Sequence, residues 1–296
     1  MSTTFTTPKK PLTWLITGCS SGFGLSLTRI IQSAGQKVVA TSRNPSRTPE
    51  LVAEVESKGG KWLKLDVDDP TSPQVIQELE KSGLGIDVLV NNAGFSIHAP
   101  VETTTGDEMR SQMESMYFGP LRLIQAVLPY MRRRKCGTIV NMSSGASLEG
   151  RETMGAYAGA KAALDGITRV LAKEIAPFNI RTLTIILGHF NTNMGSGSAA
   201  LLGKKTIPDD YEGTATEKMI QFVSNGNIQA KGDKDKAMRA LYEVVVGEGV
   251  GTGREAEKLL PLGSDMITRV QMVQEYCAHS LEVFGEITNN VNIDGC

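Results

Sequence analysis

The sequence contains few cysteines, histidines and aromatic residues, and its charges nearly balance. Its 296 residues include four cysteines and three histidines, with 5% aromatic residues and a formal net charge of −1 at pH 7. Cys19, Cys136, Cys277 and Cys296 have neither the pairing of a disulfide framework nor the spacing of metal ligands. We therefore expect reduced thiols in a cytoplasmic protein and no metal site.

Long apolar runs and blocks of like charge are also missing. No run reaches the roughly 18 apolar residues of a membrane span, and the balanced charge indicates neither a nucleic-acid nor a membrane partner. Residues 1–11, MSTTFTTPKKP, have no apolar core of a signal peptide and predict a short disordered lead-in. The 40% hydrophobic content and 31 glycines are typical of a globular α/β protein with many tight turns.

An apolar strand, a glycine turn and a helix follow one another near the start of the chain. Trp14 to Ile16 predicts a buried parallel strand, TGCSSGFG follows at 17–24, and apolar residues at helical spacing continue to Ile31. Gly18 and Gly22 would let the backbone approach a pyrophosphate, which the N–H groups at the helix start would face. The spacing G-x-x-x-G-x-G differs from the commoner dinucleotide fingerprint, so this stretch alone leaves an ordinary turn open.

The second predicted strand, residues 36–40, decides the expected cofactor. It ends in Thr41-Ser42-Arg43, where dinucleotide folds place an acid for the ribose of NAD or an arginine for the phosphate of NADP. The acid is absent and Arg43 is present, which favours NADP(H) over NAD(H). The alternative is that Arg43 is an ordinary solvated surface residue.

Strands and helices alternate along the whole chain. Further strands are predicted at 61–65, 87–90, 138–142 and 181–186, and helices at 51–57, 71–81 and 106–134. This alternation predicts an α/β protein built as a single doubly wound Rossmann-type parallel sheet with helices on both faces, over residues 12–296. After strand 87–90, the small residues of Asn91-Asn92-Ala93-Gly94 would leave room for a ribose, and asparagine can lock the turn.

A possible acid–base group lies after strand 138–142. Ser143 and Ser144 come at its carboxyl end, where open α/β sheets bind ligands, and Tyr157 and Lys161 share one helix face. A tyrosine of unperturbed pKa, about 10, exchanges protons poorly at neutral pH. A nearby lysine and a nicotinium ring would lower that pKa. By itself, Y-x-x-x-K is also common on ordinary helix surfaces.

Taken together and in order, these motifs resemble the classical short-chain dehydrogenase/reductase family. The match rests on TGCSSGFG, Asp66 after the third strand, NNAG at 91–94, a serine, and YAGAK at 157–161, and it covers about residues 12–265. Ser144 precedes Tyr157 by thirteen residues, the family spacing, so it is chosen over Ser143. A late PLGSD at 261–265 is similar to a branch with a hydrophobic-substrate lid and a C-terminal tail.

The resemblance implies a role for each matching residue. Tyr157 would be the general acid in reduction, Lys161 would lower its pKa and hold the nicotinamide ribose, and Ser144 would orient the substrate oxygen. The implied cofactor-binding residues, together with Tyr157 and Lys161, are Gly18, Ser20, Ser21, Gly22, Phe23 and Gly24 at the phosphates, Ser42 and Arg43 at the 2′ position, Asp66 and Val67 at adenine, Asn92, Ala93 and Gly94 at the adenosine ribose, and Gly188 and Thr192 at the nicotinamide.

Two positions depart from the family pattern. Met116 stands where the family has a catalytic asparagine that helps to hold a water linking the lysine to solvent. A thioether cannot make the hydrogen bonds of an amide, although the backbone carbonyl of Met116 could still hold the water. Leu187 replaces the proline of the family's Pro-Gly turn, which predicts a looser loop over the nicotinamide.

The last third of the chain predicts a lid and a tail. Residues 194–223 would be the substrate lid, with a flexible start at 195–200, and its apolar residues would either line a pocket or pack on the core. Phe95, Ile97 and His98 would close the pocket, with His98 expected on a surface loop. Residues 255–260 and 266–284 predict a helical C-terminal extension within 255–296 that shapes the pocket or buries a subunit face in a homo-oligomer.

The function predicted from the sequence is an NADP(H)-dependent oxidoreductase. It would reduce a ketone or aldehyde of a fairly bulky apolar small molecule, or oxidise the corresponding alcohol, with Tyr157 as general acid or base. The alternative is a cofactor-binding protein on the same scaffold without net redox turnover, such as a cyclase, isomerase or sensor. Met116 motivates this alternative, because fold alone does not determine function.

Overall fold

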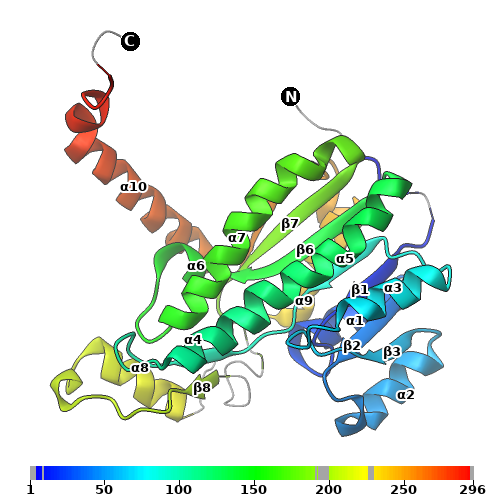
Figure 1. Ribbon diagram of the computed structural model, residues 1–296, viewed down its shortest axis with the longest axis horizontal. Coiled ribbons are helices and arrows are strands. Elements are labelled where there is room, and N and C mark those ends of the chain that lie inside the picture. Colours follow the sequence, from blue (N-terminus) through cyan, green and yellow to red (C-terminus); the bar gives the residue numbers. More distant parts are fainter. Residues whose placement is uncertain (1–4, 9, 191, 193–199, 226–229, 294–296) are drawn as a thin grey trace.

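Seven parallel strands form the central sheet of the computed structural model, which describes residues 5–8, 10–190, 192, 200–225 and 230–293 (Figure 1). The strand order is β3-β2-β1-β4-β6-β7-β9, and every neighbouring pair is parallel. The strands are β1 Thr13–Ile16, β2 Lys37–Ser42, β3 Lys61–Lys64, β4 Val88–Asn91, β6 Gly137–Ser144, β7 Ile180–Leu187 and β9 Leu259–Leu262.

Helices lie on both faces of the sheet. The α-helices of the described residues are α1 Gly22–Ser33, α2 Pro49–Ser57, α3 Pro73–Lys81, α4 Gly106–Met113, α5 Gly119–Arg134, α6 Ala146–Glu149, α7 Gly155–Ile175, α8 Ala215–Ser224, α9 Lys234–Val246 and α10 Met266–Asn289, of which α8 and α10 lie away from the sheet (Figure 1). Successive strand residues point to opposite faces. Trp14 accordingly packs in the core under α1 and α9, and Leu15 in the core under α3 and α5. Both are fully buried, which explains the unbroken apolar run of β1 and confirms the doubly wound sheet.

The long helix predicted over 106–134 is interrupted. A π-helical segment, Glu114–Phe118, separates α4 from α5. Pro120 has no N–H and cannot donate to the carbonyl of Met116, as a regular α-helix would require. Gly119 also lies so close to the β3–α3 loop that a Cβ there would be 2.6 Å from the carbonyl oxygen of Val67. The backbone therefore widens at Met116, the position that departs from the family pattern.

The predicted helix over 255–260 is wrong. Leu259–Leu262 is instead the edge strand β9, which pairs with β7 from Thr184 to Leu187. A proline is tolerated on an edge strand, and Pro261 occupies such a position. The helical part of the C-terminal extension is α10, which extends away from the body of the molecule (Figure 1).

The predicted flexible start of the lid is 195–200, of which 195–199 lie outside the described residues, and Ala200 begins a strand. Strand β8, Ala200–Leu202, pairs with β5, Ser96–His98. This pairing joins the lid to the segment that follows the NNAG loop. His98 is not a surface residue as predicted. Both of its ring nitrogens have hydroxyl partners, on Ser96 and Thr153, and burial lowers its pKa to about 4. His98 is therefore a neutral structural residue.

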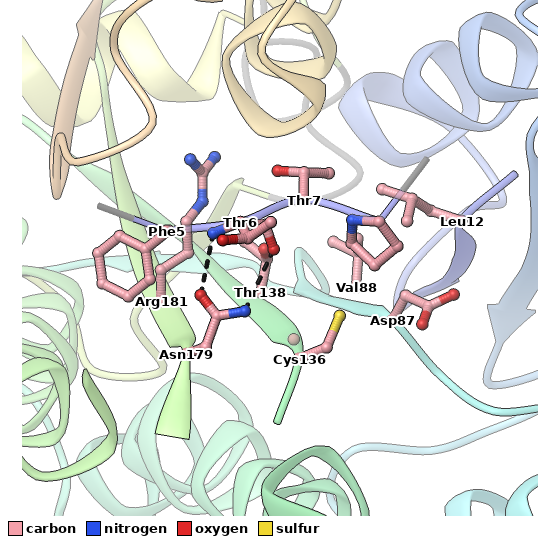
Figure 2. Close-up of a pocket in the computed structure, with 12 residues that line it drawn as sticks. Phe5, Thr6, Thr7, Leu12, Asp87, Val88, Cys136, Thr138, Asn179 and Arg181 are labelled. Carbon is pink, nitrogen blue, oxygen red and sulfur yellow. Dashed lines mark hydrogen bonds between the residues drawn. The ribbon is translucent and has the colours of Figure 1, made fainter. Parts of the chain in front are cut away.

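The start of the chain runs along the amino-terminal edge of the sheet. Within the segment predicted to be a disordered lead-in, the N–H of Thr6 donates to Asn179 Oδ1 at 2.9 Å, and Asn179 Nδ2 donates to the carbonyl of Thr6 at 3.2 Å (Figure 2). Asn179 has a φ of 54°, a left-handed conformation that asparagine tolerates. The hollow in Figure 2 is lined by residues at the starts of β4, β6 and β7, among them Val88, Thr138 and Arg181. It lies at the opposite edge of the sheet from the carboxyl strand ends, where α/β sheets bind ligands.

Two further features of the described residues bear on partners. No helix among them combines the length and apolar character needed to cross a membrane. They also contain no group of at least three histidine, cysteine, aspartate or glutamate residues arranged to hold a metal ion.

Candidate active site

The glycine turn between β1 and α1 packs backbone to backbone against the NNAG loop. Gly18 has a φ of +74°, and a Cβ there would lie 2.8 Å from the Cα of Ala93. A Cβ on Gly24 would lie 2.4 Å from the carbonyl oxygen of Gly18. Asn92 locks the turn, as predicted, because its amide donates to the carbonyls of Thr17 and Gly18 at 2.8 and 3.1 Å. Side chains larger than glycine would close this cradle.

The start of α1 suits the phosphates of a dinucleotide. The N–H groups of a first helical turn have no partners within the helix. Among the described residues, the Ser21 side chain forms no capping hydrogen bond to them. Phosphate oxygens can therefore accept these hydrogen bonds, supported by the helix dipole. Together with the glycine cradle, this fits the nicotinamide dinucleotide that the family resemblance implies.

The loop after β7 closes over the same turn. Phe23 packs edge-on against Phe190, with ring centroids 5.3 Å apart. Thr192 is half-buried and would lie 3.9 Å from a Cβ placed on Gly22. The predicted residue Thr192 thus lies beside the glycine turn that begins α1.

Leu187 is part of the sheet rather than of a loosened turn. It is the last residue of β7 and is paired with Ser144 on one side and Leu262 on the other. Its carbonyl accepts the N–H of Gly145 at 2.9 Å, and Gly188 N–H donates to Leu262 at 2.9 Å. The pairing with β6 and β9 therefore holds Leu187 and Gly188 at the end of the sheet.

The residues predicted to contact the adenine and the 2′ position lie at the ends of β2 and β3. The Ser42 hydroxyl is buried and accepts from Trp62 Nε1 at 3.0 Å. Arg43 is exposed and forms no hydrogen bond or ion pair with any residue the structure describes. Asp66 is half-buried and accepts from the N–H of Asp68 at 3.1 Å, which shapes the loop. Val67 is buried beside it.

Ser144 and Tyr157 meet at the carboxyl end of β6. Burial raises the pKa of Tyr157, whereas the nearby Ser144 hydroxyl acts in the opposite direction. The neighbouring Ser143 points elsewhere, since its hydroxyl donates to Asp165 at 2.9 Å. This geometry supports the choice of Ser144 over Ser143.

Lys161 lies one helical turn after Tyr157 and is almost fully buried. Its ammonium donates to the carbonyl of Met142 at 2.6 Å and lies 5.8 Å from the centre of the Tyr157 ring. Burial lowers the pKa of Lys161 to about 8, and the charge of Asp165 acts in the opposite direction. The negative charge of Asp165 therefore helps to keep the buried Lys161 protonated near neutral pH.

Asp165 is a member of the site that the sequence argument missed. It follows Lys161 by one more helical turn, so Tyr157, Lys161 and Asp165 share one face of α7. Its Oδ2 accepts hydroxyl hydrogens from Ser143 at 2.9 Å and Ser147 at 2.6 Å. Asp165 thereby connects α7 to the segment that carries Ser144. The four-residue spacing from Lys161 could have indicated that Asp165 shares its helix face. The serine partners of Asp165 lie on another element, so the sequence did not reveal them.

The Met116 side chain fills a closed space beside the NNAG loop. It is 1% exposed, and a Cβ on Gly94 would lie 2.3 Å from its terminal methyl group. Its sulfur accepts a hydrogen bond from the Gln112 amide at 3.1 Å, and this amide also donates to Phe95. Met116 therefore packs the site, and its side chain offers no strong hydrogen-bonding group in place of an asparagine amide.

A charged cluster at the base of α10 supports the Ser144 loop. Arg269 is 9% exposed and contacts Glu149 at 2.7 Å and Asp265 at 3.1 Å. Its guanidinium lies directly on Gly145, where a Cβ would be 2.3 Å from Cζ. Asp265 also accepts the backbone N–H of His189 at 3.2 Å. The PLGSD motif thus joins α10 to both loops that border Tyr157.

Comparison with known proteins places this geometry in a family. The sequence model of the short chain dehydrogenase family matches residues 13–200. The oxidoreductase claN of Passalora fulva is 37% identical over 210 residues, which are 71% of this chain and 94% of that protein. The 3-ketodihydrosphingosine reductase of Bacteroides thetaiotaomicron is 36% identical over 184 residues, 62% of this chain and 65% of that protein.

Solved structures agree with the sequence relatives. A short-chain dehydrogenase from Streptomyces avermitilis superposes with a TM-score of 0.85 at 30% identity, over 96% of this chain and all of that one. A metagenomic short-chain oxidoreductase in complex with NADP has a TM-score of 0.57 at 26% identity, covering 60% and 83% of the two chains. The relatives, the fold and the ordered motifs agree, and this chain belongs to the short-chain dehydrogenase/reductase family, whose members are oxidoreductases that bind NAD(P).

Proposed function

We propose that this chain is an NADP(H)-dependent oxidoreductase acting on a ketone or aldehyde of a fairly bulky apolar molecule, or on the corresponding alcohol. The observation that carries the proposal is the position of the buried Tyr157 and Lys161 on one face of α7, with the Lys161 ammonium 5.8 Å from the centre of the Tyr157 ring and Ser144 at the nearby end of β6. Two hydroxyls and an ammonium at the carboxyl edge of the sheet can orient a carbonyl and protonate its oxygen.

The residues divide the work as follows. When bound, the nicotinamide ring supplies or accepts the hydride. In reduction, Ser144 holds the substrate oxygen and Tyr157 donates its phenolic proton to that oxygen. The pKa of Tyr157, raised by burial, keeps the phenol protonated for this step. Lys161 holds the ribose hydroxyls, and its positive charge favours the phenolate that remains after proton transfer.

The reducing direction and the apolar substrate have separate support. One relative carries the name of a ketone reductase. On the lid, Leu201, Leu202 and Phe222 are 44–47% exposed, so they offer apolar surface to a substrate. The buried Cys19, whose pKa burial raises to about 11, is a protected thiol and suits the cytoplasmic location that remains part of this proposal.

A non-redox role on the same scaffold is the second candidate, because Met116 replaces a hydrogen-bonding residue. Incubation of the purified protein with NADPH and a panel of bulky apolar ketones and aldehydes distinguishes the two. The redox proposal predicts substrate-dependent loss of NADPH absorbance. Saturable NADPH binding without oxidation across the whole panel would favour the cyclase, isomerase or sensor.

We expect Asp165→Asn to move the alkaline limb of the turnover–pH profile to lower pH. The carboxylate raises the pKa of Lys161, so its loss lowers that pKa below about 8. Lys161 is charged below its pKa, and activity is therefore retained at acidic pH and lost at alkaline pH. Above the lowered pKa, the fraction of charged Lys161, and with it turnover, should fall about tenfold for each further pH unit.

The control for Asp165 is Ser147→Ala, which removes one hydrogen bond and keeps the carboxylate. It should leave the alkaline limb near its original position. A purely structural Asp165 would instead give Asp165→Asn a lower melting temperature and an equal loss of turnover at every pH. That result would exclude the proposed positioning of the Lys161 charge.

A further inference from the structure

Helix α10 carries an apolar stripe that the described part of the chain leaves uncovered. Its central residues recur every three or four positions, the spacing of a coiled-coil seam. They are Val270, Val273, Cys277, Ser280, Phe284 and Ile287. Beside them, Tyr276, Leu281 and Val283 widen the stripe and are 74%, 65% and 55% exposed. We call the six central residues the α10 seam.

The charges of α10 lie away from the seam. At 100° per residue, Glu275, Glu282 and Glu286 fall on the face opposite Cys277 and Phe284. Arg269, the basic residue at the start of the helix, forms ion pairs with Glu149 and Asp265. The result is an acidic outer face and an uncharged inner face, the charge pattern of a helix that pairs along one side.

The base of α10 fixes the direction in which the helix projects. Arg269 and the buried Met266 hold its first turn against the body near α6. From there the helix extends into solvent (Figure 1). A soluble monomer rarely exposes a continuous apolar patch of more than a few hundred Å². Towards its free end the α10 stripe exposes Leu281, Phe284 and Ile287 together, at 65%, 55% and 62%, which favours a partner surface there.

We propose that the α10 seam pairs with the α10 seam of a second copy of this chain. The helix has 24 residues, so it is about 36 Å long and about 10 Å wide. Two copies packed along this length bury on the order of 1,000 Å² in total, the size at which specific interfaces begin. Small residues at the centre, Cys277 and Ser280, allow the two helices to approach closely.

The charge of the helix selects a second copy over a membrane surface. Helices that bind membranes in the interface carry lysine and arginine on their polar face. From Val270 to Asn289, α10 has three glutamates and no lysine or arginine. An anionic surface would repel this helix, whereas seam-to-seam pairing leaves the glutamates of both copies facing water.

The test compares the mass of the full-length protein with that of two charge-matched variants by analytical ultracentrifugation. Val273→Glu with Phe284→Glu places two charges in the seam and should halve the mass of the assembly. Gln271→Glu with Ala278→Glu adds the same charge outside the seam and should leave the mass unchanged. Circular dichroism confirms that both variants are folded.

A second readout uses Cys277 near the middle of the seam. In a Cys296→Ser background, a flexible bis-maleimide should crosslink two chains through Cys277, and Cys277→Ser should abolish the product. The proposal is overturned by a monomeric wild-type protein, or by equal masses for all three proteins. It is also overturned if the wild type remains monomeric but floats with phosphatidylserine-containing vesicles in a seam-dependent manner.

Discussion

Tyr157→Phe should lower the rate of NADPH oxidation by about 10²–10⁴-fold, the usual contribution of general acid catalysis. The substitution removes only the hydroxyl, so the ring can keep its packing next to Ala146 and Ala160. NADPH affinity and melting temperature should therefore remain near those of the wild type. The measurement is turnover with the best substrate of the panel, together with a fluorescence titration of NADPH.

Variants of Ser144 and Lys161 should show different effects on turnover and on NADPH affinity. Ser144→Ala should reduce turnover more than NADPH affinity, because its proposed partner is the substrate oxygen. Lys161→Ala should reduce both, because one ammonium serves the ribose and the phenol. If Tyr157→Phe kept more than about a tenth of wild-type turnover, the loss would be smaller than the usual contribution of general acid catalysis. The phenol would then not be the proton donor. The non-redox candidate would then be preferred.

The parts of the fold that the sequence predicts are those determined locally. Trp14 to Ile16 and the glycines that follow define a strand, a turn and a helix within a few residues, and the structure confirms them. Six of the central strands were predicted from short apolar runs, which reflect burial on both faces of a parallel sheet. Tyr157 and Lys161 lie one helical turn apart, so their shared helix face is also a local prediction, whereas the choice of Ser144 as their partner came from the family resemblance.

The parts that were missed depend on distant partners. Leu259–Leu262 is a strand because it finds the open edge of β7 more than seventy positions earlier, and local periodicity cannot reveal that pairing. Asp165 gains its role from Ser143 and Ser147, on the segment after β6. The break at Met116 was visible in Gly119-Pro120, but apolar spacing alone predicts an uninterrupted helix. Apolar periodicity thus reports burial but does not reveal the partner of each residue.

Arg43 should set the preference for NADP(H), and its position explains how. It follows directly after the buried Ser42, whose hydroxyl is engaged by Trp62. The Arg43 guanidinium itself is exposed and unpaired within the described part of the chain, so it is available to a 2′-phosphate without breaking another contact. The end of β2 also lacks the acid that would hold a ribose hydroxyl pair and repel a phosphate. Among solved structures of this fold, one is a complex with NADP and another, at 17% identity, is a complex with NAD, so the fold alone does not determine the cofactor.

We expect Arg43→Ala to weaken NADPH binding by about 10–150-fold, which corresponds to the loss of one charge-assisted contact of about 1.5–3 kcal/mol. NADH has no 2′-phosphate, so its affinity should be unchanged, and the variant should bind the two cofactors almost equally. Arg47→Ala is the matched control, since it removes a second exposed arginine from the same connection between β2 and α2. Fluorescence titrations of both cofactors against the wild type and both variants provide the measurement. Equal affinities of the wild type for NADPH and NADH, or a loss of NADPH affinity in Arg47→Ala alone, would show that Arg43 does not read the phosphate.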